Sequence, residues 1–373
     1  MNFDYNEEQQ LLADSVRRFL AKDYAFEARK KIVASKEGWS AQVWAQLAEM
    51  GLTGLPFSPD HGGFGGGAVD LMGIMEAAGD ALLVEPYLPT LMGGQLVARA
   101  GSDAQKKAVL PAIVDGKLRM AFAHTEKGAR YNLAKVGASA RSSAGGAGPG
   151  WEITGEKLVV LGAPAAEKFV VSAKTDKGLC LFLVDAKNVK IKPYVTLDEQ
   201  RAGDLALQKA PGELLGAEGG ALPVVEVVVD FATALVCAEA VGAMKFACDT
   251  TLEYLKTRKQ FGVPIGTFQA LQHRMVDMYV AQEQARSMAC LACSKVDAST
   301  DATTDARDRA RAISAAKIKI ADNARLISQE SIQLHGGMGM SEELKVSHTF
   351  RRLTMIAQQF GDADHHLARF ASL

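Results

Sequence analysis

Apolar residues recur with the period of a helix through the first part of the chain. The first such run places five apolar residues on one predicted face: Leu11, Leu12, Val16, Phe19 and Leu20. A later run follows Ser40, a residue type that caps helix N-termini, and stops at Gly51, a residue type that ends helices. Similar patterns over 70–88 and 103–113 predict further helices. We therefore predict an N-terminal helical domain over residues 1–118.

The pattern changes near residue 120 to short runs of β-branched and other apolar residues, separated by Gly, Pro, Asp and Asn. The predicted strands are Trp151–Leu161, Phe169–Ser172, Leu179–Val184 and Val189–Val195. A tract rich in Ser and Gly over 142–150 predicts a surface loop between strands. Together these features predict a small β domain over residues 119–228.

Helical periodicity returns near Val229 and continues through the rest of the chain. The predicted helices lie near residues 230–257, 268–296, 303–334 and 343–371. Between the first two, Gly262, Pro264 and Gly266 interrupt the pattern, and Thr267 is predicted to cap the second helix. We predict a C-terminal helical bundle over residues 229–373.

Composition indicates a globular protein with a large core, because 48% of the 373 residues are hydrophobic and the mean hydropathy is +0.01. The formal net charge of −1 favours neither nucleic acid nor an acidic membrane surface as a partner. No apolar run reaches the ~20 residues of a membrane span. The N-terminus lacks the apolar stretch of a signal peptide, so we expect a cytoplasmic protein.

Five cysteines are scattered along the chain, and their odd number predicts no disulfide framework. Cys290 and Cys293 form a single Cys-x-x-Cys pair within a predicted helix, with no second pair and no His at ligand spacing. We expect these thiols to pack in the core, and we predict no metal site.

The interruption after residue 257 carries candidate chemistry. Arg258, Lys259, Gln260 and Phe261 place two cations, an amide and an aromatic ring at a helix end. The guanidinium group suits phosphate oxygens and the ring can stack on a flat heterocycle, so the segment suits a nucleotide. The alternative is that the two cations only complement the dipole of the helix, with no ligand present.

Two motifs favour the first interpretation. The pattern RKQFGxPIxxFQxxQH from Arg258 and the segment QLHGGMGMSEE from Gln333 together resemble the acyl-CoA dehydrogenase family. The order of helices, strands and helices matches that family's layout: mostly α with a central β-barrel-like domain and a C-terminal four-helix bundle. The resemblance implies that residues of both segments hold the FAD of a neighbouring subunit: Arg258, Gln260, Phe261, Gln269, Gln333, Gly336 and Gly337.

The resemblance also implies an activity in fatty acid metabolism, such as β-oxidation. Members of the family remove the α-proton of an acyl-CoA thioester with a carboxylate while a hydride passes to the flavin of FAD, and an electron-transfer flavoprotein usually accepts the electrons. The usual positions of the carboxylate correspond here to Phe360 and Ala232, neither of which can accept a proton.

Glu239 is the first alternative candidate for the base, because it lies two helical turns beyond Ala232 among apolar residues. The competing interpretation is that Glu239 is structural and pairs with a cation of a neighbouring helix or subunit. Asp362, with Asp364, is the second candidate, since it lies close to Phe360. His365 and His366 could also act as bases or could be core residues.

The segment that faces the flavin in this family is altered. AHTEKGARYN from Ala123 keeps the family's threonine as Thr125, a cofactor-binding candidate, but bulky residues such as Arg130 and Tyr131 replace a glycine and a serine. Downstream, Val159 and Leu161 stand where family members offer an aromatic ring and a hydroxyl.

Three functions follow from the resemblance. The first is the smaller subunit of a heteromeric enzyme, in a heterotetramer with a larger acyl-CoA dehydrogenase chain; the ending FGDADHHL resembles pimeloyl-CoA dehydrogenase small subunits. The second is a self-sufficient homo-oligomer that uses Glu239. The third is a non-catalytic acyl-CoA-binding or scaffold protein on the same fold. Nitroalkane-oxidase-like or monooxygenase chemistry, with Asp362 or Asp364 as the base, is a further alternative.

Overall fold

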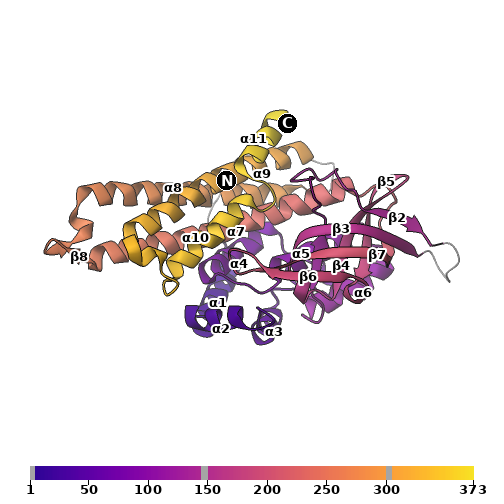
Figure 1. Cartoon of the computed structure of the whole chain (residues 1–373), viewed down its shortest axis with the longest axis horizontal. Helices are drawn as coiled ribbons and strands as arrows, with labels where there is room; N and C mark the ends of the chain where they lie inside the picture. The colour runs from indigo at the N-terminus through magenta and orange to yellow at the C-terminus, as the bar shows by residue number, and fades with distance from the viewer. Residues whose placement is uncertain (1–4, 144–149, 300–304) are drawn as a thin grey trace.

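The computed structural model describes residues 5–143, 150–299 and 305–373. It has three layers: a first group of helices, a curved sheet, and a long helical bundle that extends away from the sheet (Figure 1). The tract 142–150 and the predicted helix start at 303 lie partly outside the described residues. No helix within the described residues combines the length and the apolar character that crossing a membrane requires.

The first layer holds the helices α1 (Glu7–Asp23), α2 (Phe26–Ala34), α3 (Ala41–Glu49), α4 (Ala68–Ala81), α5 (Tyr87–Ala100) and α6 (Asp103–Val114). The predicted cap at Ser40 is confirmed, because its hydroxyl accepts a hydrogen bond from the Val43 amide at 3.3 Å. The turn between α4 and α5 begins at Leu82, which adopts the left-handed conformation with a φ of 57°. This turn carries Glu85 into the centre of the molecule.

The second layer is a sheet of seven strands: β1 (Met120–Ala123), β2 (Ser139–Ser142), β3 (Trp151–Leu161), β4 (Lys168–Thr175), β5 (Gly178–Asp185), β6 (Lys190–Val195) and β7 (Arg201–Leu215). Strands β4, β2, β3, β7 and β5 pair in this order, and β5 pairs back onto β4, so the sheet closes on itself. The expected barrel-like β domain is therefore present.

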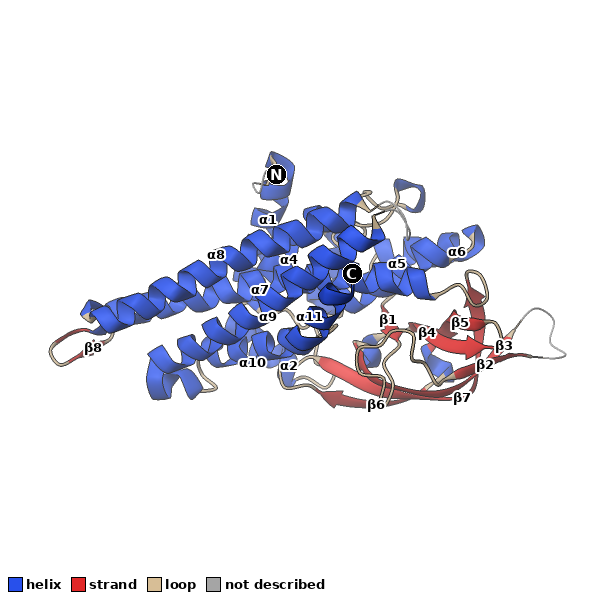
Figure 2. Cartoon of the chain, turned by 90° about the horizontal axis from the view of Figure 1, so that it is seen from above, coloured by secondary structure: helices blue, strands red, loops and turns tan. Residues whose placement is uncertain are grey.

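The third layer holds α7 (Leu222–Thr257), α8 (Gln269–Ala298), α9 (Ala306–His335), α10 (Lys345–Gln358) and α11 (Ala363–Ser372). Helix α7 begins several residues before the predicted start, with Pro223 in its first turn. The hairpin β8 (Lys259–Gln260) and β9 (Val263–Pro264) joins α7 to α8 at the end of the bundle farthest from the sheet (Figure 2).

Two predictions about this layer are wrong. Thr267 does not cap α8: it lies in a short 3-10 helix (Ile265–Thr267), where its hydroxyl donates to the Pro264 carbonyl at 2.7 Å. The predicted helix over 343–371 is two helices, because Phe360 and Gly361 have φ values of 60° and 127° and cannot continue a helix. The buried Lys317 ammonium group donates to the Gly361 carbonyl at 2.6 Å and holds this break in place.

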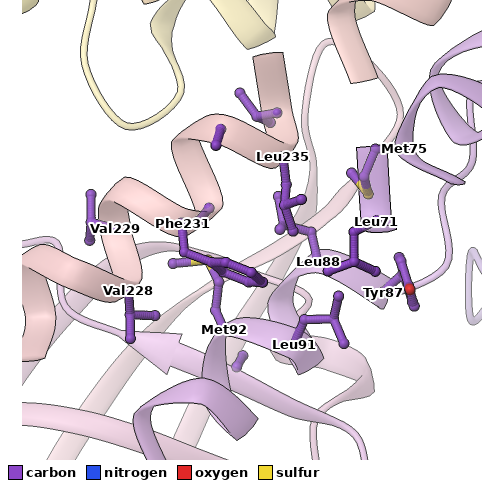
Figure 3. Packing of buried hydrophobic residues seen from close by; sticks show 14 of the residues in the cluster. Leu71, Met75, Tyr87, Leu88, Leu91, Met92, Val228, Val229, Phe231 and Leu235 are labelled. Atoms are coloured by element: carbon purple, nitrogen blue, oxygen red, sulfur yellow. The ribbon is translucent and has the colours of Figure 1, made fainter. Parts of the chain in front are cut away.

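Helices α4, α5 and α7 meet in the core next to the sheet. Figure 3 shows the labelled side chains of the three helices interdigitating: Leu71, Met75, Tyr87, Leu88, Leu91, Met92, Val228, Val229, Phe231 and Leu235. Helices α4 and α7 approach so closely that a Cβ on Gly79 would lie 1.9 Å from the Glu239 carbonyl oxygen. A Cβ on Gly242 would lie 1.8 Å from the Glu76 carbonyl oxygen. The two glycines therefore fix the position of Glu239 along α4.

The loop over residues 196–200, which we call the β6–β7 loop, joins the sheet to both helical layers. Asp198 pairs with Arg352 of α10 at 2.6 Å. The next residue, Glu199, pairs with Arg29 of α2 at 2.7 Å and lies 3.0 Å from the Nδ1 atom of His348 in α10. The Gln200 amide donates to the Leu83 carbonyl at 2.9 Å. Three consecutive side chains thus bind three different parts of the chain.

Candidate active site

A cavity of about 900 Å³, which we call the central cavity, lies where the three layers meet. Its walls come from the α4–α5 turn, from β1 and β3, from the first half of α7, and from the end of α10 with α11. Some lining residues are exposed, such as Arg130 and Thr125, whereas others are buried, such as Met75, Glu85 and Met92. The central cavity therefore has an open mouth and a closed inner end.

Glu239 lines the central cavity, but its carboxylate is fully engaged. The Arg352 guanidinium group donates to both oxygens, at 2.6 Å and 2.7 Å, and its remaining nitrogen donates to Asp198 at 2.6 Å. All three side chains are buried. The structure therefore matches the competing interpretation, in which Glu239 pairs with a cation of a neighbouring helix. A carboxylate with both oxygens bound to a guanidinium group is poorly placed to accept a proton from a substrate.

The other base candidates also have structural partners. Asp362 caps α11, since its carboxylate accepts from the His365 amide at 2.8 Å, and it does not line the central cavity. His366 is buried with its Nε2 atom 3.2 Å from the Phe360 carbonyl oxygen, and burial lowers its pKa to about 3. Burial also lowers the pKa of His365. Phe360 lines the central cavity, and Ala232 is fully buried in α7.

The wall formed by β1 and β3 is backed by a buried polar network. The Lys157 ammonium group, fully buried, donates to Glu126 at 2.7 Å and to the Ser172 hydroxyl at 3.0 Å. Ser172 lies 2.9 Å from the Nδ1 atom of His124, which lines the central cavity. Burial, opposed by Glu126, lowers the pKa of Lys157 to about 8, and burial with the Lys157 charge lowers that of His124 to about 4. Thr125 lies between these residues, at the mouth.

The altered loop after Thr125 contacts the C-terminal helices. The Tyr131 hydroxyl lies 3.5 Å from the Gln358 amide oxygen, and its ring lies 5.1 Å from the His365 ring. The Arg130 guanidinium group lies 3.5 Å from the Asp362 carboxylate. The bulky residues that replace the family's small ones therefore occupy space between this loop and α11, at the mouth of the central cavity.

The second set of candidates gathers at the hairpin end of the bundle. Phe261 is 90% exposed, and Arg258, Gln260 and Gln269 are exposed beside it. The Tyr254 and His335 rings stack with centroids 4.4 Å apart, so the two motif segments lie side by side. Gln333, Gly336 and Gly337 are exposed as well, and a Cβ on either glycine would meet nothing within 4 Å. The structure thus brings together all the residues expected to hold a neighbour's FAD.

This hairpin end fits a dinucleotide. Within the described residues, no carboxylate lies at ion-pair distance from Arg258, so its guanidinium group is free to bind phosphate. The open backbone at Gly336 and Gly337 allows close approach of a ligand, and the exposed Phe261 ring offers a stacking face. The central cavity offers less to a flavin ring. Thr125 is the one predicted cofactor-binding residue that lines it, and the Tyr131 side chain contacts Gln358 across its mouth.

Glu85 and Arg352 were not among the predicted site residues. Glu85 is the one charge in an apolar run that reads ALLVEPYLP, and this contrast is a signal that could have identified it. Arg352 follows Arg351 in a helix, and no local pattern shows that it reaches Glu239, which lies 113 residues earlier.

Comparisons with known proteins agree with this architecture. Models of the N-terminal and C-terminal domains of acyl-CoA dehydrogenases match residues 6–117 and 222–371. The acyl-CoA dehydrogenase FadE12 of Mycobacterium tuberculosis is 31% identical over 374 residues, covering 95% of this chain and 93% of FadE12.

Solved structures extend the likeness to the whole fold. The FAD complex of PigA matches with a TM-score of 0.89 at 26% identity, covering 100% of this chain and 98% of PigA. A chain of the ChsE4–ChsE5 complex of Mycobacterium tuberculosis matches with a TM-score of 0.89 at 24% identity, covering 100% and 98%, a likeness that shows the fold alone. From its domain matches, its relatives and its layers, the chain belongs to the acyl-CoA dehydrogenase family of FAD-binding oxidoreductases.

Proposed function

We propose that this chain is the smaller, partner-type subunit of a heteromeric FAD-dependent acyl-CoA dehydrogenase. In this proposal the hairpin end completes the FAD site of a larger companion chain, and the companion supplies the base that removes the α-proton. The observation that carries the proposal is the contrast between the two candidate sites: the hairpin end is exposed and unobstructed, whereas the central cavity lacks a free carboxylate at either family position.

Three of the five carboxylates that line the central cavity among the described residues are held in ion pairs, and the other two, Glu85 and the exposed Glu226, are not. Glu239 and Asp198 share Arg352. Asp230 accepts from Arg309 at 3.0 Å and from Arg369 at 2.7 Å. A base must be free to form a hydrogen bond to the proton that it removes, so these ion pairs disfavour proton abstraction by Glu239, Asp198 and Asp230.

The hairpin end supplies what a companion's cofactor requires. FAD brings the hydride acceptor of the reaction, and this chain's contribution is binding. Arg258 would neutralise pyrophosphate charge, Phe261 would cover the nucleotide, and the backbone at Gly336 and Gly337 would approach it closely.

The test is to purify this chain alone and together with a larger acyl-CoA dehydrogenase homologue from the same genome. We expect little flavin absorbance from the chain alone, and a yellow assembly from the pair whose flavin band bleaches on anaerobic addition of an acyl-CoA. A chain that is yellow by itself and bleaches with an acyl-CoA would overturn the partner role and support a self-sufficient homo-oligomer.

Two further parts of the proposal rest on the resemblance. The natural electron acceptor of the assembly would be an electron-transfer flavoprotein, and adding one to the bleached assembly should restore the flavin band. The likeness of the chain ending to pimeloyl-CoA dehydrogenase small subunits stays a prediction, which comparing turnover of pimeloyl-CoA with that of other acyl-CoAs by the assembly would check.

A further inference from the structure

Glu85 places an unsatisfied oxygen atom in the inner end of the central cavity. Its side chain is 3% exposed, and its Oε1 atom accepts from the Ser40 amide at 3.2 Å. Within the described residues, its Oε2 atom is buried with no hydrogen-bond partner. The buried Tyr24 hydroxyl also interacts with this carboxyl group. A carboxylate offers about four acceptor sites, so Glu85 keeps acceptor capacity beside the central cavity that a ligand group can use.

The inner end around this atom is otherwise apolar. Met75 of α4 and Leu88 and Met92 of α5 also line the central cavity and are buried, and Figure 3 shows their side chains in the core between α4, α5 and α7. Burial raises the pKa of Glu85 to about 7, so its neutral and charged forms are both populated near neutral pH. A hydroxyl group satisfies either form, because it can donate to a carboxylate and accept from a carboxylic acid.

Other ligand groups fit the inner end less well. A ligand carboxylate would need a cation, but Arg352 and Arg369 are already paired with buried acids and Arg130 is exposed at the mouth. A ligand ammonium group would lose its hydration free energy in an apolar pocket, and the Glu85 carboxyl group, only partly ionised, would compensate for part of it. A ligand hydroxyl group loses much less hydration free energy when it enters the pocket.

We propose that the central cavity of this chain binds a CoA thioester whose acyl chain carries a hydroxyl group, and that the Glu85 Oε2 atom bonds that hydroxyl at the inner end. The inference rests on the proposed function in treating the central cavity as an acyl-binding site without a base of its own. The acyl chain runs from the exposed mouth to the buried inner end, so the thioester stays near Thr125 and the hydroxyl lies toward the far end of the chain. The ligand is bound here without being oxidised.

The experiment measures dissociation constants by isothermal titration calorimetry with this chain alone and in its assembly. The probes are straight-chain acyl-CoAs of about six to twelve carbons, their ω-hydroxy forms and their ω-carboxy forms, which span the length that a cavity of this size admits. The proteins are the wild type, Glu85→Gln, Glu85→Leu and a control, Glu152→Gln, which removes an exposed acid of β3 outside the central cavity.

We expect the wild type to bind an ω-hydroxyacyl-CoA of suitable length roughly 10- to 100-fold more tightly than the plain acyl-CoA of that length. Glu85→Leu should abolish this preference, and Glu85→Gln should retain part of it, because an amide can still bond a hydroxyl. Glu152→Gln should behave as the wild type. Circular dichroism spectra of the variants check that they fold.

Two results overturn the inference while the proposed function stands. The first is equal binding of plain and hydroxylated chains at every length, and the second is a preference for the ω-carboxy forms. A hydroxyl preference that survives Glu85→Leu also overturns it, because the preference then comes from another group. If no acyl-CoA binds but the chain still restores flavin to its companion, the central cavity is not an acyl site and only the inference fails. If the chain neither binds acyl-CoA nor restores flavin, both fail.

Discussion

The Glu85 carboxyl group is buried, so its ionised form is poorly solvated. Burial raises its pKa from 4.5 to about 7, so the folded protein favours the neutral form. A group whose pKa is raised on folding contributes its full stability below the unfolded pKa, and this contribution is lost as the pH rises through the folded pKa. Glu85 should therefore destabilise the fold increasingly as the pH rises from about 4.5 to about 7, with the full effect above that.

Glu85→Gln should remove this penalty. The amide is always neutral, so we expect the variant to gain up to about 3 kcal/mol in free energy of unfolding at about pH 8 relative to the wild type. The difference should shrink toward zero near pH 5. Urea denaturation at several pH values measures it, with Glu152→Gln as the control for loss of an exposed acid. An equal difference at all pH values would show that the Glu85 carboxyl is not the titrating group.

Glu239 and Arg352 are coupled so tightly that removing one charge leaves the other buried. We expect Glu239→Gln to lower the free energy of unfolding by about 3 to 5 kcal/mol, the usual cost of breaking one side of a buried ion pair. The double variant with Arg352→Met should recover part of the loss, because it removes the stranded cation. Thermal or urea unfolding of the single and double variants measures both effects.

The same variant separates a structural role for Glu239 from a catalytic one. If Glu239 is structural, an assembly that contains Glu239→Gln and remains folded should still bleach with an acyl-CoA at close to the wild-type rate. A rate that falls by several orders of magnitude, with stability unchanged, would make Glu239 the base and contradict the partner role.

At the scale of elements, the β8–β9 hairpin is the segment that the proposed function assigns to a companion's FAD. Its Phe261 has a φ of 54°, a conformation that non-glycine residues seldom adopt, and its ring is held out into solvent. The ring contacts Phe268 edge to face, with centroids 6.1 Å apart. The hairpin therefore presents Phe261 in a fixed position next to Arg258.

Arg258→Ala should weaken FAD retention by the assembly about 10- to 100-fold, because it removes a charge-assisted contact to phosphate. Lys256→Ala is the matched control, since Lys256 is an exposed cation two residues away that pairs with Glu253 at 2.8 Å. Flavin content after gel filtration, or fluorescence titration with FAD, compares the two. Equal retention in both variants would remove Arg258 from the FAD site.

The sequence predicted elements well where periodicity was strong. Strand β3 spans the predicted residues Trp151–Leu161, since its β-branched residues follow one another between clear turns. Strand β7, at 15 residues, was missed because Arg201–Leu215 is rich in small and charged residues and owes its conformation to pairing with β3 and β6. At the hairpin end, the candidate residues from Arg258 to Phe261 could be recognised from the sequence because they are contiguous. The partners of Glu239 and Glu85 could not be predicted, because they come from distant parts of the chain.

At the scale of the molecule, the β6–β7 loop joins the sheet to both helical layers. Although burial alone would raise its pKa, hydrogen bonds from His348 and Arg29 lower the pKa of Glu199 from 4.5 to about 2. A depressed pKa gives stability that is complete above the unfolded value and is lost as the pH falls toward the folded one. The connection should therefore weaken between about pH 4.5 and pH 2.

Glu199→Gln should remove this acid dependence and lower the free energy of unfolding at neutral pH by about 2 kcal/mol. It should also loosen the connection between layers, so that signals from the sheet and from the helices no longer change together. Near-ultraviolet signals from Trp151 in β3, in a background with Trp39 and Trp44 replaced by Phe, and far-ultraviolet helix signals follow the two during urea unfolding. Transitions that coincide in the variant as they do in the wild type would show that the layers are coupled by other contacts.

The β6–β7 loop also limits how the protein can be recombined with its relatives. A chimaera that takes the sheet from another family member would bring its own residues at the positions of Asp198, Glu199 and Gln200, while Arg29 and Arg352 would remain in the host helices. Two buried guanidinium groups would then face unselected side chains. Exchange of the sheet therefore has to include these two arginines and His348, so the transferable unit in this fold is the sheet together with parts of α2 and α10.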